Sequence, residues 1–225
     1  MPVLGTVTIG QSPRIDLIPE MQAILGPEVE VVEGGALDGL SLGEIQSFRP
    51  QAGDYVLVTR LRDGTSVKIA EKHILPLMQA QIDKVVGLGA DVVALVCTGS
   101  FPEFTCKKPL IEPQKVLGHM VRSVSGRLAV GVVVPDTDQI AQAERRWQDA
   151  GRTVRVVAAS PYGELRHLDD AAAGLREAGC ELGVLDCIGF TLEMKKRFSE
   201  RLGAPCVLAR SALARVLKEI LSCGA

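Results

Sequence analysis

The sequence of 225 residues predicts an α/β protein made of two parallel-sheet lobes. Apolar runs typical of buried strands alternate with amphipathic stretches typical of helices along the whole chain. In addition, residues 89–99 and 179–189 repeat one pattern without a gap: a glycine, then an apolar run, then Cys-x-Gly. This repeat indicates an internal duplication. We therefore expect two lobes related by a pseudo-twofold axis, with the active cleft between them.

The first half opens with an apolar strand over residues 3–9 that leads into a polar turn. The next helix is expected to start at Ser12-Pro13, which has the form of an N-cap followed by a first-turn proline. Ser41 and Glu44 have capping-box spacing and predict another helix. The remaining predicted elements of this half are strands over 28–33 and 91–96 and helices over 15–25, 41–50 and 69–88.

A hairpin is predicted between these elements, as an insertion near residues 54–69. Asp63-Gly64 separates two β-rich segments, 54–61 and 65–69, and such a dipeptide is a strong hairpin signal. The polar side chains of the hairpin either cover the cleft or lie on the surface. Charged side chains along a hairpin usually alternate outward, which favours the surface. The polar side chains are Thr59, Arg60, Ser66 and Lys68.

The second half repeats the alternation after a loop over residues 101–111. A buried strand over 127–134 ends at the polar turn Pro135-Asp136-Thr137, the counterpart of the turn after the first strand. The other predicted strands cover 153–159, 182–186 and 205–209. The predicted helices cover 113–124, 138–150 with a stop at Gly151, 164–178, 191–202 with Thr191 as cap, and 211–221.

Composition excludes several classes of function. The net charge is −2, acids and bases are mixed, and the chain has only two Tyr and one Trp, which disfavours nucleic-acid binding. No apolar run is long enough for a membrane span, and the N-terminus lacks a signal pattern. We therefore expect a cytoplasmic protein without a membrane partner.

Six cysteines are present, and without an export pattern we expect reduced thiols. The sequence contains no CxxC pair, and its three histidines (His73, His119 and His167) do not have metal-ligand spacing. This disfavours a zinc site. No metal or cofactor is expected.

Cys97 and Cys187 are the candidate catalytic residues. Each follows a predicted strand and precedes a glycine turn, the edge at which open α/β sheets bind ligands. Two facing thiols suit removal of a proton from one face of a carbon and its delivery to the other, and backbone N–H groups in such turns stabilise a thiolate. The alternative is that both are small buried hydrophobes. We assign that role to the unmatched cysteines, Cys106, Cys180, Cys206 and Cys223.

Asp186 precedes Cys187 and alternates to the opposite side of the strand, so it is interpreted as a buried structural acid. The polar turns supply candidate binding groups, because small and polar residues that open a helix offer N–H donors to an anion. Arg14 adds a fork for a substrate carboxylate, although a surface ion pair would explain it equally. The ordinary alternative is a βα loop with a capping serine. The candidate substrate-binding residues are Gly10, Gln11, Ser12, Arg14, Thr98, Gly99, Ser100, Pro135, Ile188 and Gly189.

The sequence resembles the AroM family over essentially its whole length. The resemblance rests on TIGQSPR at residues 8–14, GTSV at 64–67 and LDCIGF at 185–190, in matching order and spacing. Through this family, and through the paired Cys turns, the chain resembles the aspartate/glutamate/hydantoin racemase superfamily. That resemblance implies two Rossmann-like lobes, the first comprising 1–100 plus 207–225 and the second 101–206.

The resemblance also implies cofactor-independent proton transfer at the carbon α to a carboxylate, with Cys97 and Cys187 as acid and base. The chain departs from amino-acid racemases at Thr98-Gly99 and Ile188-Gly189, where those enzymes often have Asn-Thr and Thr-His. The groups that would hold an α-amino group are therefore not evident. We expect a racemase or isomerase acting on a small carboxylate-bearing molecule, and the resemblance makes a homodimer plausible.

Other functions remain open at this stage. The same architecture can support decarboxylation with one thiol that protonates an enolate, or cis–trans isomerisation with a nucleophilic thiol. The chain could instead be a non-catalytic binding or regulatory protein, linked by its family name to aromatic amino-acid metabolism.

Overall fold

The computed structural model describes residues 1–124, 126–148 and 153–222. The chain forms two compact units: unit 1 holds Met1–Pro113 and the segment from Ala214 on, and unit 2 holds Gln114–Leu213. From the sequence, the first lobe was expected to end at residue 100 and to resume at 207. In the structure the compact units divide after Pro113 and after Leu213, and residues 110 and 111 pair with the sheet of unit 1.

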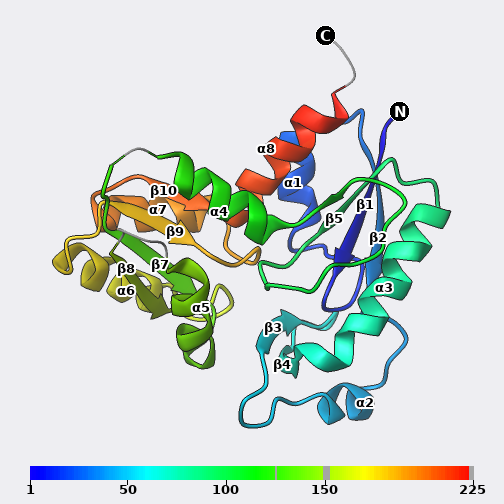
Figure 1. The fold of residues 1–225 in the computed structure, drawn as a ribbon, viewed down its shortest axis with the longest axis horizontal. Helices are drawn as coiled ribbons and strands as arrows, with labels where there is room; N and C mark the ends of the chain where they lie inside the picture. Colours follow the sequence, from blue (N-terminus) through cyan, green and yellow to red (C-terminus); the bar gives the residue numbers. More distant parts are fainter. Residues whose placement is uncertain (125, 149–152, 223–225) are drawn as a thin grey trace. The chain divides into compact units, whose positions relative to one another are not determined.

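The sheet of unit 1 has four parallel strands in the order β2-β1-β5-β6. Strands β1, β2 and β5 are labelled in Figure 1. Helix α3 packs against β1 and β2. Strand β6 falls in the predicted 101–111 loop, and its two residues are too short to give a periodic signal. The strands are β1 Val3–Thr8, β2 Glu30–Gly35, β5 Val92–Leu95 and β6 Leu110–Ile111.

The sheet of unit 2 is also parallel, in the order β10-β9-β7-β8. If the strands of each sheet are numbered along the chain, both sheets have the spatial order second, first, third, fourth; in unit 2 this order is β8-β7-β9-β10. The predicted α/β class with two parallel-sheet lobes is confirmed, and the shared topology supports an internal duplication. The strands are β7 Val130–Val134, β8 Val154–Ala158, β9 Leu182–Leu185 and β10 Cys206–Leu208.

The helices follow the predicted pattern, with shifts of a few residues at their ends. The helix predicted over 138–150 begins as a 3₁₀ turn and continues to Trp147; the predicted stop at Gly151 lies outside the described residues. The helices are α1 Ile18–Leu25, α2 Leu42–Ser47, α3 Glu71–Gly87, α4 Pro113–Ser123, η1 Thr137–Gln139, α5 Ile140–Trp147, α6 Leu165–Glu177, α7 Leu192–Leu202 and α8 Ala209–Leu221.

Two of the three predicted helix caps are confirmed. Ser41 and Glu44 form a reciprocal capping box at α2, and the Thr191 hydroxyl accepts the Met194 N–H at the start of α7. The prediction for Ser12 is wrong, because α1 starts later, at Ile18. The Ser12 hydroxyl instead donates to the Asp38 carboxylate at 2.5 Å.

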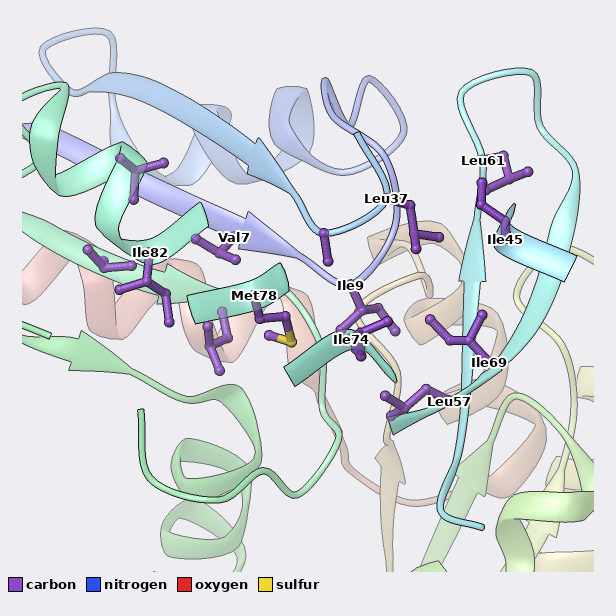
Figure 2. Packing of buried hydrophobic residues seen from close by; sticks show 14 of the residues in the cluster. Val7, Ile9, Leu37, Ile45, Leu57, Leu61, Ile69, Ile74, Met78 and Ile82 are labelled. Atoms are coloured by element: carbon purple, nitrogen blue, oxygen red, sulfur yellow. The ribbon is translucent and has the colours of Figure 1, made fainter. Parts of the chain in front are cut away.

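The predicted hairpin consists of β3 Val56–Arg60 and β4 Ser66–Ala70, which pair antiparallel. It belongs to the core of unit 1. Leu57 and Ile69 are buried in one apolar cluster with Ile9, and with Ile74 of α3 (Figure 2). Each such side chain contributes about 1.5–3 kcal/mol by its burial. The hairpin is therefore fixed beside the turn that follows β1.

Among the helices of the described residues, none is long and apolar enough to cross a membrane.

Candidate active site

Both candidate cysteines lie at the switch point of their own sheet, where the chain changes the side on which strands are added. In unit 1 this point lies between β1 and β5, and the Val96 N–H donates to the Val7 carbonyl at 2.9 Å. In unit 2 it lies between β7 and β9, and the Asp186 N–H donates to the Val133 carbonyl at 2.9 Å. The next residue in each strand extension is the cysteine. Ligands of open α/β sheets bind at such positions.

The turn after Cys97 places a backbone donor on the thiol. The Gly99 N–H points to the Cys97 Sγ at 3.3 Å, and the Ser100 N–H donates to the Tyr55 hydroxyl at 3.1 Å. A Cβ on Gly99 would lie 2.8 Å from Leu57 Cδ2. A larger residue at position 99 would therefore force the side chains of Leu57 and Phe101 to shift.

The turn after Cys187 repeats this geometry. The Gly189 N–H points to the Cys187 Sγ at 3.4 Å, and a Cβ on Gly189 would lie 2.7 Å from the Tyr162 hydroxyl oxygen. The guanidinium of Arg210 donates to the carbonyls of Ile188 and Gly189, each at 2.9 Å. In both units, then, a thiol accepts an N–H from the second residue after it.

This arrangement suits acid–base chemistry. Cys97 and Cys187 are both partly exposed residues with free thiols. A backbone N–H that points at the sulfur favours the thiolate over the thiol. Each site can therefore hold a proton or release it.

The remaining described cysteines have different surroundings. Cys180 and Cys206 are buried, and burial raises the pKa of the Cys180 thiol and raises that of Cys206 to about 12. Cys106 is partly exposed and packs against the core of unit 1, and Cys223 lies outside the described residues.

We expect a neutral alkylating reagent to distinguish these thiols in the native protein. Cys97 and Cys187 should react readily, whereas at pH 8 only about one Cys206 side chain in 10⁴ is a thiolate. Peptide mass spectrometry after timed iodoacetamide exposure measures each rate, with the unfolded protein as the reference. Modification of Cys206 as fast as Cys187 would contradict the assigned surroundings.

The polar turn after β1 does hold a carboxylate, but it is one of the protein's own. The Ser12 N–H donates to Asp38 Oδ1 at 2.8 Å, and the Gly35 N–H donates to Asp38 Oδ2 at 3.0 Å. The Arg62 guanidinium donates to the Ser12 carbonyl at 2.9 Å from Nε. The predicted anion donors of Ser12 are therefore engaged by Asp38, and sequence reasoning missed this residue.

The Arg14 guanidinium forms a two-pronged pair with the carboxylate of Asp16. The Arg14 side chain is only 5% exposed, and Nε and Nη2 each donate to the Asp16 carboxylate at 2.8 Å. Nη1 donates to the Thr8 hydroxyl at 2.9 Å. Arg14 thus stiffens the turn after β1, and the ion pair considered from the sequence is formed, with Arg14 buried rather than on the surface.

A pocket of about 220 Å³ lies between this turn and the tip of the hairpin. The Gln11 side-chain carbonyl accepts the Arg62 N–H at 3.0 Å and joins the two walls. Three guanidinium groups and two carboxylates line the pocket, so its lining is rich in anion donors. These residues are Arg14, Arg60, Arg62, Asp16 and Asp63.

The expectation that the polar hairpin residues lie on the surface holds for Ser66 and Lys68, which are exposed. It is wrong for Thr59, which is 3% exposed. A Cβ on Gly10 would lie 2.4 Å from the Thr59 Oγ1, so the hairpin packs directly on the backbone of the turn. Arg60 is half-buried and donates to the Gly64 carbonyl at 2.9 Å.

The counterpart turn after β7 also uses its acid internally. The Asp136 carboxylate accepts the Asp138 N–H at 3.0 Å and caps the 3₁₀ turn η1, and Pro135 beside it is half-buried. Asp186 is buried as expected, at 1% exposure. It accepts the Trp147 Nε1–H at 2.7 Å and pairs with Arg146.

Tyr55, Tyr162 and Arg210 contact the cysteine turns and were not identified from the sequence. Of these three, Arg210 had a local signal, as the one charged residue in the mostly apolar stretch at 206–214. Among the described residues, no group of three or more His, Cys, Asp or Glu could hold a metal ion.

Solved structures with the same fold are racemases and a decarboxylase. A liganded mutant of arylmalonate decarboxylase has a TM-score of 0.66 and 16% identity, over 100% of this chain and 94% of that one. Glutamate racemase from Aquifex pyrophilus has a TM-score of 0.60 and 14% identity, over 98% and 84%. Allantoin racemase from Pseudomonas fluorescens has a TM-score of 0.61 and 16% identity, over 97% and 90%.

The chain therefore shares its fold with these racemases and this decarboxylase. Comparison with curated proteins gave no match. The model of the AroM protein family matches residues 4–221, so the chain belongs to the AroM family.

Proposed function

We propose that this protein is a cofactor-independent racemase or isomerase that moves a proton at the carbon α to a carboxylate of a small acid. Cys97 and Cys187 act as base and acid on opposite faces of that carbon. The observation that carries the proposal is the equivalent N–H···Sγ contact at the switch point of each sheet. If the two cysteines were only buried hydrophobic residues, the same N–H···Sγ contact would not be needed at the equivalent position of both units.

In the proposed reaction, one thiolate removes the α-proton, so that the C–H bond breaks and an S–H bond forms. The electron pair moves into the carboxylate, giving an enediolate, and the other thiol delivers its proton to the opposite face. The product has the inverted configuration. The cysteine that began as a thiolate ends as a thiol, and the other ends as a thiolate. Each thiol needs a fast route to solvent, which the partial exposure of both supports.

The pocket between the β1 turn and the hairpin tip is the proposed place for the substrate carboxylate in unit 1. Gln11, Arg60 and Arg62 supply donors there, while Gly10, Ser12 and Arg14 shape its wall through their internal contacts. The remaining proposed contacts come from the turns after the strands: Thr98, Gly99, Ser100, Pro135, Ile188 and Gly189.

Solvent exchange tests this function. Wild-type protein in D₂O is incubated with panels of 2-aryl, 2-hydroxy and 2-amino acids, and deuterium at the α-carbon is followed by NMR. We expect exchange with at least one acid and none with the Cys97→Ala/Cys187→Ala double variant.

A matching panel of disubstituted malonates reports decarboxylation by release of CO₂. Exchange that survives in the double variant would contradict the proposal. An acid that stabilises wild type and double variant equally against thermal unfolding, without exchange in either, would identify a binding protein instead.

A further inference from the structure

Arg210 is a deeply buried charged side chain beside the turn that follows Cys187. It is the second residue of α8, follows β10 directly, and is 2% exposed. Its Nε donates to the Ile188 carbonyl and its Nη2 to the Gly189 carbonyl, each at 2.9 Å. Both carbonyls belong to the turn that follows Cys187.

We propose that Arg210 is a positioning residue for Cys187. The Ile188 carbonyl and the Gly189 N–H belong to the same peptide unit, and in a trans peptide these two groups point in opposite directions. A guanidinium that holds the carbonyl on one side therefore directs the N–H to the other side. On that side the N–H meets the Cys187 Sγ at 3.4 Å.

The charge of Arg210 adds to this geometric effect. A guanidinium stays protonated even when buried, and a hydrogen bond from a cation polarises the peptide that accepts it. The N–H of that peptide becomes a stronger donor to the sulfur, which favours the Cys187 thiolate. The significance of this effect for catalysis rests on the proposed function, but the effect itself is a property of the free protein.

The turn after Cys97 is held in a different way. There the Tyr55 hydroxyl accepts the Ser100 N–H, so a neutral group contacts a donor of the turn rather than its carbonyls. A change at Arg210 is therefore expected to act on Cys187 and to leave Cys97 as an internal reference.

The test compares Arg210→Met and Arg210→Lys with wild type, without any substrate. Iodoacetamide labelling rates of Cys187 and Cys97 are measured in the same molecules by peptide mass spectrometry, and the ultraviolet absorbance of the thiolate is recorded. Methionine keeps most of the side-chain length but has no donor. Lysine keeps the charge but lacks the two-pronged fork. The matched control is Arg197→Met in the same unit, which removes one charge from the exposed pair with Asp169.

We expect Arg210→Met to slow labelling of Cys187 by on the order of tenfold, the effect of one pKa unit on the thiolate population. Arg210→Lys should be intermediate, Cys97 should keep its rate, and Arg197→Met should match wild type. An unchanged or faster rate at Cys187 in Arg210→Met, or an equal loss at both cysteines, would overturn the proposal. If thermal unfolding shows that Arg210→Met does not fold, Arg210→Lys decides: a slower Cys187 at constant Cys97 supports the proposal and an unchanged Cys187 rejects it. Because no substrate is used, a failure to find turnover leaves this result intact.

Discussion

Replacing either Cys97 or Cys187 by serine is expected to lower the rate of inversion at the α-carbon by about 10²–10⁴-fold, the usual contribution of one acid–base group. A serine hydroxyl keeps the size of the thiol and its position beside the Gly99 or Gly189 N–H. It ionises far less readily near neutral pH, so it cannot act as the base. The measurement is the initial rate at which one enantiomer of the acid identified for the wild-type protein is converted into the other, with α-proton exchange in D₂O recorded beside it.

Cys106→Ser is the matched control. Cys106 is also reduced and partly exposed, but it lies in the segment between β5 and β6 rather than in a cysteine–glycine turn. Its replacement should leave the exchange rate unchanged. If one of Cys97→Ser and Cys187→Ser retains full turnover, the two-thiol mechanism is wrong and a one-thiol decarboxylase becomes the better description.

Replacing Asp186 by alanine is expected to lower the free energy of unfolding by about 3–5 kcal/mol, because it leaves a mostly buried guanidinium without this carboxylate. Asp186 accepts the Trp147 Nε1–H at 2.7 Å and pairs with Arg146, whose side chain is 11% exposed. Urea unfolding followed by Trp fluorescence and by circular dichroism measures the change.

Asp169→Ala provides the comparison. Asp169 forms an ion pair with Arg197 on the surface of the same unit, and exposed pairs contribute little because water and salt screen them. Its replacement should change the stability much less than Asp186→Ala. Equal losses in the two variants would show that the Asp186 cluster is not the buried support inferred from its contacts.

The cysteine turns could be predicted because their signal is local. An apolar strand followed by Cys-x-Gly occurs in both halves, and a strand in a parallel sheet ends where ligands bind. The Ser41 and Thr191 caps were predictable for the same reason, since each cap and its partner lie three residues apart.

The partners of the polar turns could not be predicted, because they come from distant parts of the chain. Asp38 is 26 residues from Ser12, Tyr55 is 45 residues from Ser100, and Arg210 is 22 residues from Ile188. No local periodicity links such pairs; the fold brings them together. For the same reason the sequence suggested Ser12 as a helix cap, although its hydroxyl binds Asp38.

The hairpin shows how burial can reverse an expectation from charge alternation. Thr59 was assigned to the surface together with Arg60, Ser66 and Lys68, because polar side chains of a hairpin usually alternate outward. Because Leu57 on the same face of β3 enters the core with Ile9, Thr59 is drawn inward against Gly10. The pocket beside it includes Arg60 and Arg62, which were assigned to the surface or not considered from the sequence.

The most direct test of the two-thiol mechanism is the position of the isotope after less than one turnover in D₂O. If one thiol removes the α-proton and the other delivers a proton to the opposite face, the inverted product carries solvent deuterium while recovered substrate keeps its hydrogen. NMR and mass spectrometry of the separated enantiomers give the deuterium content of the inverted product and of the recovered substrate. Substrate-derived hydrogen in the inverted product would show that one group serves both faces, and would contradict the assignment of Cys97 and Cys187 to opposite faces.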